Sequence, residues 1–141
     1  RVKEEMRVAN NKPRLRMNVL YYYAALYNYL VAGTSNRCEI VTGYFTKYGD
    51  GGVDLQPLAR LVKSEVRNMA CILGIPERLI EKPPTAGLWE GQCDEEEMGL
   101  SYEELDKYLL TGEASDRTRR RIEEIKRRSE HKLHSPPMPP F

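Results

Sequence analysis

One stretch of the chain, residues 43–54, gathers aromatic rings, four glycines, Lys47, Asp50 and Asp54. Glycines let a backbone approach a ligand closely, and aromatic faces stack on a base. A lysine meets a phosphate or a carboxylate, and an aspartate accepts hydrogen bonds from a ribose hydroxyl or an amine. An ordinary surface turn rarely needs so many different chemistries together, so the stretch indicates ligand binding.

A second candidate site follows an apolar run. Residues 29–33 read Tyr-Leu-Val-Ala-Gly, the form of a buried parallel strand, and Gly-Thr-Ser-Asn at 33–36 ends it. Ligands of open α/β sheets bind beyond the carboxyl ends of the strands, where Thr34 would meet a nucleotide. Glu39 falls in the opening turns of the next predicted helix, where a carboxylate is favoured and can hold a divalent cation. Taken alone, these residues fit a helix-capping turn better than a ligand site.

The rest of the chain predicts helices separated by irregular segments. Apolar residues at i, i+3 and i+4 spacing, followed by Gly74, predict a helix over 58–73. A Pro-Pro pair and an acidic run bracket 83–99, which we expect to be a mobile loop. We expect helices over 12–27, 36–43, 58–73, 102–110 and 115–128, and a proline-rich tail over 135–141.

These elements contain only one convincing buried strand. A parallel strand needs neighbours on both sides to satisfy its backbone groups, so a missing N-terminal segment or a second chain must complete the sheet. Residues 1–7 read as a charged helix already under way, and the first residue is Arg1 rather than Met, which also suggests a missing upstream part. We therefore expect an α/β fold, a helix-rich C-terminal half with few parallel strands, in which residues 1–141 form part of one domain.

Composition excludes several classes of partner. The 22 Lys and Arg residues nearly balance 21 Asp and Glu residues, so no overall field favours nucleic acid or a membrane surface. No stretch is long and apolar enough to span a bilayer. Cys38, Cys71 and Cys93 are odd in number and widely spaced, which favours free thiols in a reducing cytoplasm.

Six segments resemble, in order, the ammonia-dependent NAD synthetase family. Together they extend over nearly the whole chain, and their order and composition make the resemblance specific. They read Lys-Pro-Arg-Leu-Arg-Met at 12–17, Gly-Thr-Ser-Asn at 33–36, Gly-Tyr-Phe-Thr-Lys-Tyr-Gly-Asp-Gly-Gly at 43–52, Lys-Pro-Pro-Thr-Ala-Gly-Leu-Trp-Glu-Gly at 82–91, Leu-Ser-Tyr-Glu-Glu-Leu-Asp at 100–106 and Ser-Glu-His-Lys at 129–132.

The resemblance implies a partial Rossmann-like, adenine nucleotide alpha-hydrolase-like domain of three layers. It implies a ligase in which ATP adenylates the nicotinate carboxylate of deamido-NAD with release of pyrophosphate, after which ammonia displaces AMP to give NAD. Mg²⁺ assists the first step. The family acts as a homodimer, and we expect the tyrosines at 21–23 to pack, at the dimer contact, rather than to stack on a ligand.

The resemblance also implies roles for individual residues, and no catalytic residue among them is assigned. ATP would contact Thr34, Lys63 and Thr85, and Glu39 would bind the magnesium ion. Deamido-NAD would contact Arg14, Lys47, Asp54, His131 and Lys132.

Without the resemblance, several of these residues have plain structural interpretations. Lys63 is as well explained by a solvated position on its helix, and His131 and Lys132 by the surface. Arg16 competes with Arg14 for a phosphate. Asp54 would meet a hydroxyl or the ammonia pathway, and its side chain does not decide between them.

One part of the family pattern is absent. The Ser-Gly-Gly-x-Asp-Ser loop, which cradles pyrophosphate on backbone amides and adds a second carboxylate for magnesium, does not occur in the 141 residues. The chain is therefore expected to supply part of a ligase site. One alternative is a nucleotide-binding fragment without chemistry, which the sequence does not separate from a ligase. The other is a different ATP pyrophosphatase, such as a GMP synthetase or a tRNA-modifying enzyme. The resemblance of the loop 47–54 and of His131-Lys132 to the deamido-NAD side of the family's site argues against it.

Overall fold

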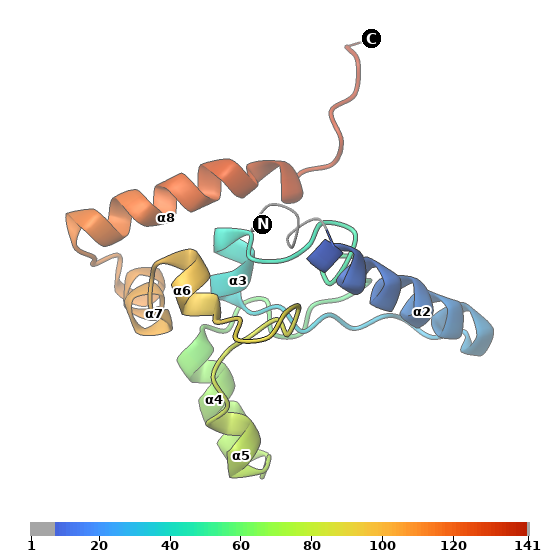
Figure 1. Cartoon of the computed structure of the whole chain (residues 1–141), viewed down its shortest axis with the longest axis horizontal. Coiled ribbons are helices and arrows are strands. Elements are labelled where there is room, and N and C mark those ends of the chain that lie inside the picture. Colours follow the sequence, from blue (N-terminus) through green and yellow to red (C-terminus); the bar gives the residue numbers. More distant parts are fainter. Residues whose placement is uncertain (1–7, 141) are drawn as a thin grey trace.

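The computed structural model describes residues 8–140, and these are almost entirely helix and irregular loop (Figure 1). The helix expected within residues 1–7 lies outside the described part. The elements, in chain order, are α2 (Asn11–Tyr27), α3 (Arg37–Thr42), α4 (Lys63–Ile72), α5 (Glu77–Ile80), α6 (Asp94–Met98), α7 (Tyr102–Thr111), α8 (Asp116–Ser129) and the 3-10 helix η1 (Glu130–Lys132).

The core lies where α3, α6, α7 and α8 meet. Figure 1 shows α8 running along one side of the molecule, over α3 and α7, while α4 and α5 project away from this group. Ser101 and Ser115 cap α7 and α8 by accepting the amides of Glu104 and Thr118, so local sequence fixes where both helices begin. The buried apolar residues of this core are Cys38, Val62, Met98, Leu100, Tyr102, Leu105 and Ile122.

The strand predicted over 29–33 does not form as such. Within residues 8–140 this segment makes one isolated parallel bridge, between Ala32 and Leu55. Val31 and Gly33 bond to the backbone around residue 55 on one edge, whereas Leu30 has 71% of its surface exposed. The expectation of a buried strand was wrong for these residues, because a strand forms only where a neighbour supplies a continuous ladder and a covering layer.

Helix α2 agrees with the predicted helix over 12–27, but its apolar face is uncovered. Leu15, Val19, Tyr22 and Leu26 are all more than half exposed. The tyrosines pack mainly on one another, since the rings of Tyr22 and Tyr23 lie edge to face with centroids 5.3 Å apart. Their expected place in a contact between chains stays a prediction.

The helix predicted over 58–73 begins later, at Lys63. Residues 57–60 form turns instead, and the helix starts only after Val62, because Val62 is extended and its amide donates to Glu65 Oε2 at 2.8 Å. The apolar stripe is real but not buried: no residue of α4 is buried, and Ile72 is 86% exposed. The short helix α5 was not predicted.

The segment 83–99 is only partly irregular. Its acidic run forms α6, whereas residues 83–93 lack regular structure. The two ends of the irregular part lie together, since the Asp94 amide donates to the Pro84 carbonyl at 3.2 Å. The mobility of this loop stays a prediction. Residues 135–140 have no regular structure, as expected for the tail. None of the helices in the described residues has the length and apolar character to cross a bilayer.

Candidate functional site

A cavity of about 690 Å³ lies among segments that are far apart in the sequence. Its walls come from α2, the segment 32–35, the loop 43–53, the start of α4 and the segment 82–92. Thr34, Glu39, Lys63 and Thr85, which lie far apart in the sequence, all line it. The four residues expected on the ATP and magnesium side of the site are therefore brought together.

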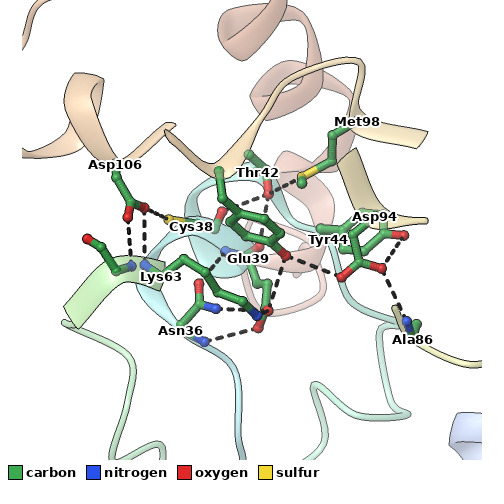
Figure 2. Close-up of polar contacts among 12 residues, drawn as sticks. Asn36, Cys38, Glu39, Thr42, Tyr44, Lys63, Ala86, Asp94, Met98 and Asp106 are labelled. Atoms are coloured by element: carbon green, nitrogen blue, oxygen red, sulfur yellow. Dashed lines mark hydrogen bonds and ion pairs between the residues drawn. The ribbon is translucent and has the colours of Figure 1, made fainter. Parts of the chain in front are cut away.

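Glu39 is held at the cavity wall by its own helix. The Asn36 amide donates to Glu39 Oε2 at 3.1 Å, and the Glu39 amide donates to Asn36 Oδ1 at 3.1 Å, which makes a capping box at the start of α3 (Figure 2). Lys63 Nζ lies 3.5 Å from Glu39 Oε1. Burial raises the pKa of Glu39, and the charge of Lys63 partly opposes this rise.

Lys63 is the first residue of α4, and its ammonium faces the cavity rather than open solvent. Nζ lies 4.7 Å from the centre of the Tyr102 ring, a cation–π geometry. The side chain keeps 21% of its surface exposed, so a ligand can reach the charge.

Tyr44 and two further carboxylates, Asp94 and Glu97, form a hydrogen-bonded wall beside Glu39 that the sequence analysis did not identify. The Tyr44 hydroxyl donates to Glu97 and also lies 3.2 Å from Asp94 Oδ1. The Ala86 amide donates to the same Asp94 oxygen at 3.1 Å, which places the neighbouring Thr85 against this wall (Figure 2). Burial, with the adjacent carboxylates, raises the pKa of the Tyr44 hydroxyl.

A second group of predicted residues gathers behind the loop 43–52. Lys132 lines the cavity and donates to the carbonyls of Gly43 and Phe45, each at 2.8 Å. Burial lowers the pKa of Lys132. These bonds attach η1 to the loop.

Arg14, Lys47 and His131 connect to one another outside the cavity wall. Arg14 Nε donates to the Lys47 carbonyl at 3.4 Å, and Lys47 Nζ donates to the His131 carbonyl. Arg16, the competitor of Arg14, does line the cavity. The two arginines differ because residues two apart on a helix point to different faces.

Asp54 also lies away from the cavity, exposed on the surface. It accepts from the Val31 amide at 2.7 Å and from the Tyr21 hydroxyl at 3.0 Å, so it ties the extended segment to α2. Asp50, four residues earlier, lines the cavity and accepts the Thr46 amide at 3.0 Å.

The described residues supply little for a metal by themselves. Within residues 8–140, no group of three or more His, Cys, Asp or Glu side chains is arranged to hold an ion. Mg²⁺ commonly takes one or two carboxylates together with waters and substrate phosphates. Glu39 therefore fits a magnesium site that a nucleotide completes.

Comparison with known proteins identifies the family of the chain. Residues 1–136 match the protein family described as NAD synthase. The NH(3)-dependent NAD(+) synthetase of Carboxydothermus hydrogenoformans is 56% identical over 136 residues, which are 96% of this chain and 56% of that protein. The chain thus spans about half the length of the curated relatives it matches.

Two solved structures also superpose on most of the chain. An NMN synthetase from Francisella tularensis superposes with a TM-score of 0.91 at 45% identity, covering 94% of this chain and 56% of that one. An NH3-dependent NAD synthetase from Campylobacter jejuni superposes with a TM-score of 0.68 at 30% identity, covering 93% and 54%. These relatives imply an α/β nucleotide-binding fold, of which the described residues are a helix-rich part with almost no strands. The chain belongs to the NAD synthase family.

Proposed function

We propose that this chain supplies part of the active site of a ligase that uses ATP to join ammonia to deamido-NAD, giving NAD, AMP and pyrophosphate. The observation that carries the proposal is the cavity shared by Thr34, Glu39, Lys63 and Thr85, which come from four separate segments. Membership of the NAD synthase family supports it.

On the ATP side, Lys63, Thr34 and Thr85 would contact the nucleotide. A half-buried ammonium such as that of Lys63 neutralises the charge that grows on the phosphates as pyrophosphate leaves. The hydroxyls of Thr34 and Thr85, which line the cavity from two separate segments, would donate hydrogen bonds to the nucleotide.

Glu39 would hold Mg²⁺ together with the phosphates of ATP, and the bound ion supplies positive charge opposite the triphosphate. A single carboxylate from this chain suits an ion that keeps several waters. A Ser-Gly-Gly-x-Asp-Ser loop on a completing segment would add the second carboxylate and cradle the pyrophosphate.

On the other side, Arg14, Lys47, Asp54, His131 and Lys132 would contact deamido-NAD. Lys132 is the best supported, because it lines the cavity. For the other four to reach the same ligand, the dinucleotide must extend past the loop 43–52 to the surface of α2 and η1.

The reaction balances without a cofactor beyond ATP and magnesium. The nicotinate oxygen attacks the α-phosphorus, and the bond to pyrophosphate breaks. The nitrogen of ammonia then attacks the activated carbonyl carbon, the bond to AMP breaks, and the nitrogen loses a proton. Free ammonium is the proposed source of the nitrogen. Burial raises the pKa of Cys38 to about 12, which makes this one thiol a poor glutaminase nucleophile.

We also propose that the domain is a Rossmann-like, adenine nucleotide alpha-hydrolase-like fold of three layers once it is complete. Within residues 8–140, one edge of 29–33 pairs with no other backbone segment, and the other edge bonds to residues 54 and 55 as in a parallel pair, which supports this fold. An N-terminal segment or a second chain would add the missing strands. The uncovered apolar face of α2 fits the contact of a homodimer.

The test is a pyrophosphate-release assay with ATP, Mg²⁺, deamido-NAD and ammonium, carried out on the protein as its source organism produces it. Turnover that needs all four components is expected. Lys63→Met should lower kcat/KM for ATP about a hundredfold, as for other lost charge contacts to a transition state. Lys107→Met, which removes an exposed lysine of α7, is the control. ATP binding without any turnover would favour the fragment without chemistry.

A second candidate substrate follows from one observation. The chain superposes better on the NMN synthetase than on the C. jejuni NAD synthetase, with TM-scores of 0.91 and 0.68. This favours amidation of the deamidated mononucleotide, nicotinate mononucleotide, by the same chemistry. Measuring kcat/KM for both nicotinate nucleotides in parallel decides between them, since the higher value identifies the substrate class.

A further inference from the structure

Two polar residues of helix α7, Tyr102 and Asp106, lie behind residues that line the cavity. Neither of them lines the cavity itself. They are one turn apart on the same face of the helix, and 3% and 8% of their surfaces are exposed. A buried carboxylate and a buried phenol are costly unless they are hydrogen-bonded, so their partners show what they do.

Asp106 caps a helix to which it does not belong. The first amides of a helix have no partner within it, and the residue before α4, Val62, has no side chain that accepts a hydrogen bond. The Lys63 amide donates to Asp106 Oδ1 at 3.1 Å, and the Ser64 amide donates to Asp106 Oδ2 at 2.7 Å (Figure 2). The carboxylate also complements the positive end of the helix dipole.

The same carboxylate reaches α3. Cys38 donates its thiol hydrogen to Asp106 Oδ1 at 3.0 Å, and Cys38 directly precedes Glu39. Asp106 thus links the backbone of Lys63 to the helix that carries the other half of the ion pair.

Tyr102 holds the opposite end of the lysine side chain. The Lys63 ammonium lies over its ring, and the Tyr102 hydroxyl lies 3.4 Å from Glu39 Oε1 and 3.3 Å from Asp94 Oδ2. Asp94 in turn accepts the Ala86 amide, next to Thr85. The Tyr102 hydroxyl therefore connects Glu39, through Asp94, with the segment that contains Thr85.

We propose that Tyr102 and Asp106 are positioning residues for the Lys63–Glu39 pair: Asp106 fixes the lysine backbone, and Tyr102 fixes its ammonium and the carboxylate opposite. This proposal rests on the proposed function, because it assigns the pair to ATP. The simpler interpretation is that both residues only stabilise the core, as Leu105 between them does. The two interpretations differ in which kinetic constant changes.

The variants Asp106→Asn and Tyr102→Phe separate these interpretations in the protein at its natural length. Asparagine turns one acceptor into an amide donor facing the start of α4, and phenylalanine keeps the ring while removing only the hydroxyl. The control is Leu105→Val, which trims the core between the two residues without altering a hydrogen bond.

Steady-state kinetics give the first readout. Both variants should raise KM for ATP by about tenfold, as expected for a lost hydrogen bond to a charged group, with KM for the nicotinate nucleotide unchanged. A purely structural role lowers the amount of folded enzyme, and hence apparent kcat, with every KM unchanged. The proposal is overturned if neither variant raises KM for ATP more than Leu105→Val does.

A second readout does not depend on activity. After ¹³C-methylation of the lysines, Lys63 should give an upfield NMR signal because it sits over the Tyr102 ring. Asp106→Asn should move this signal toward those of exposed lysines, whereas Tyr102→Phe and Leu105→Val should keep it. An unmoved signal in Asp106→Asn refutes the positioning role. If the unaltered protein releases no pyrophosphate, the proposed function fails, and this signal still decides the positioning role.

Discussion

The group of α3, α7 and α8 and the α2 side of the molecule both contain apolar residues, yet they bury them differently. Leu105 and Ile122 have no exposed surface, whereas Leu26 of α2 is 59% exposed. Helices α7 and α8 pack with α3 and α6 around a shared core. On the α2 side, nothing in the described residues covers the exposed apolar side chains.

The same difference separates the residues of the proposed site. The Lys63–Glu39 pair is attached, through Asp106 and Tyr102, to the group of α3, α7 and α8, which we call the closed side. Asp54 belongs to the α2 side, which we call the open side, where it ties α2 to the extended segment 29–33. Completing the sheet should therefore change the surroundings of Asp54 and α2 more than the geometry of the Lys63–Glu39 pair.

The largest effect expected from this comparison is on folding. Leu105→Ala should lower the free energy of unfolding of the 141-residue chain by about 3 kcal/mol, because it leaves a cavity in a closed core. Leu26→Ala should change it by less than about 0.5 kcal/mol. Urea unfolding followed by circular dichroism measures both. Equal losses would contradict the distinction between the two sides, and a larger Leu26 effect in the natural-length protein would show that α2 is covered there.

Cysteine reactivity tests the same contrast chemically. Cys38 has no exposed surface, while Cys71 on α4 is exposed. Alkylation of Cys38 by iodoacetamide should be slower by about a hundredfold or more, because reagent reaches it only after local opening. Peptide mass spectrometry over time gives both rates, and urea should make them similar. Comparable rates without urea would mean that the α3–α7 contact opens easily.

Much of the helical structure could be predicted from the sequence, because spacing and caps are local. Ser101, Ser115 and Gly112 mark the ends of α7 and α8 within a residue or two of the prediction. The start of α4 could not, since it depends on Val62 being extended and on Asp106 from another helix. The strand at 29–33 failed because strand formation depends on neighbours that the described residues lack.

The candidate site also has one part that the sequence indicated and one part that it did not. The family resemblance named Thr34, Glu39, Lys63 and Thr85 as site residues, and all four line the same cavity. The wall of Tyr44, Asp94 and Glu97 has no sequence signal, because its partners lie about fifty residues apart along the chain. Only a tertiary fold brings them together.

Two glycines offer a smaller, matched test of packing on the closed side. Gly43 ends α3 and Gly112 ends α7, both with positive φ, so alanine strains the backbone similarly at each. A Cβ at Gly43 would lie 2.2 Å from Ser129 Cβ, whereas nothing lies within 4 Å at Gly112. Gly43→Ala should therefore cost about 1–2 kcal/mol more in unfolding free energy than Gly112→Ala. Equal costs in urea titrations would mean that α8 does not pack on α3 as described.

The smallest expected effect is on how the free energy of unfolding depends on pH, and it arises where the start of α7 contacts the start of α8. Glu104 Oε2 accepts the Ser101 amide at 3.0 Å, and Glu104 Oε1 accepts the Thr118 hydroxyl at 2.8 Å. Both bonds lower the pKa of Glu104 below its ordinary 4.5, and the bond from the Ser101 amide contributes most. Its stabilisation is therefore present above pH 4.5 and is lost as the pH falls through the lower pKa of the folded state.

Glu104→Gln should flatten the fall of unfolding free energy below pH 4.5, where Glu104 itself begins to bind a proton in the unfolded chain. The change should stay below about 1 kcal/mol, because the side chain is exposed and water screens it. Glu103→Gln removes a charge from the same turn and should leave the slope nearly unchanged. Urea titrations at several pH values between neutral and acid give the slopes. If both variants flatten the curve equally, the effect belongs to the general charge of the helix start, and the Ser101–Glu104–Thr118 contacts do not set it.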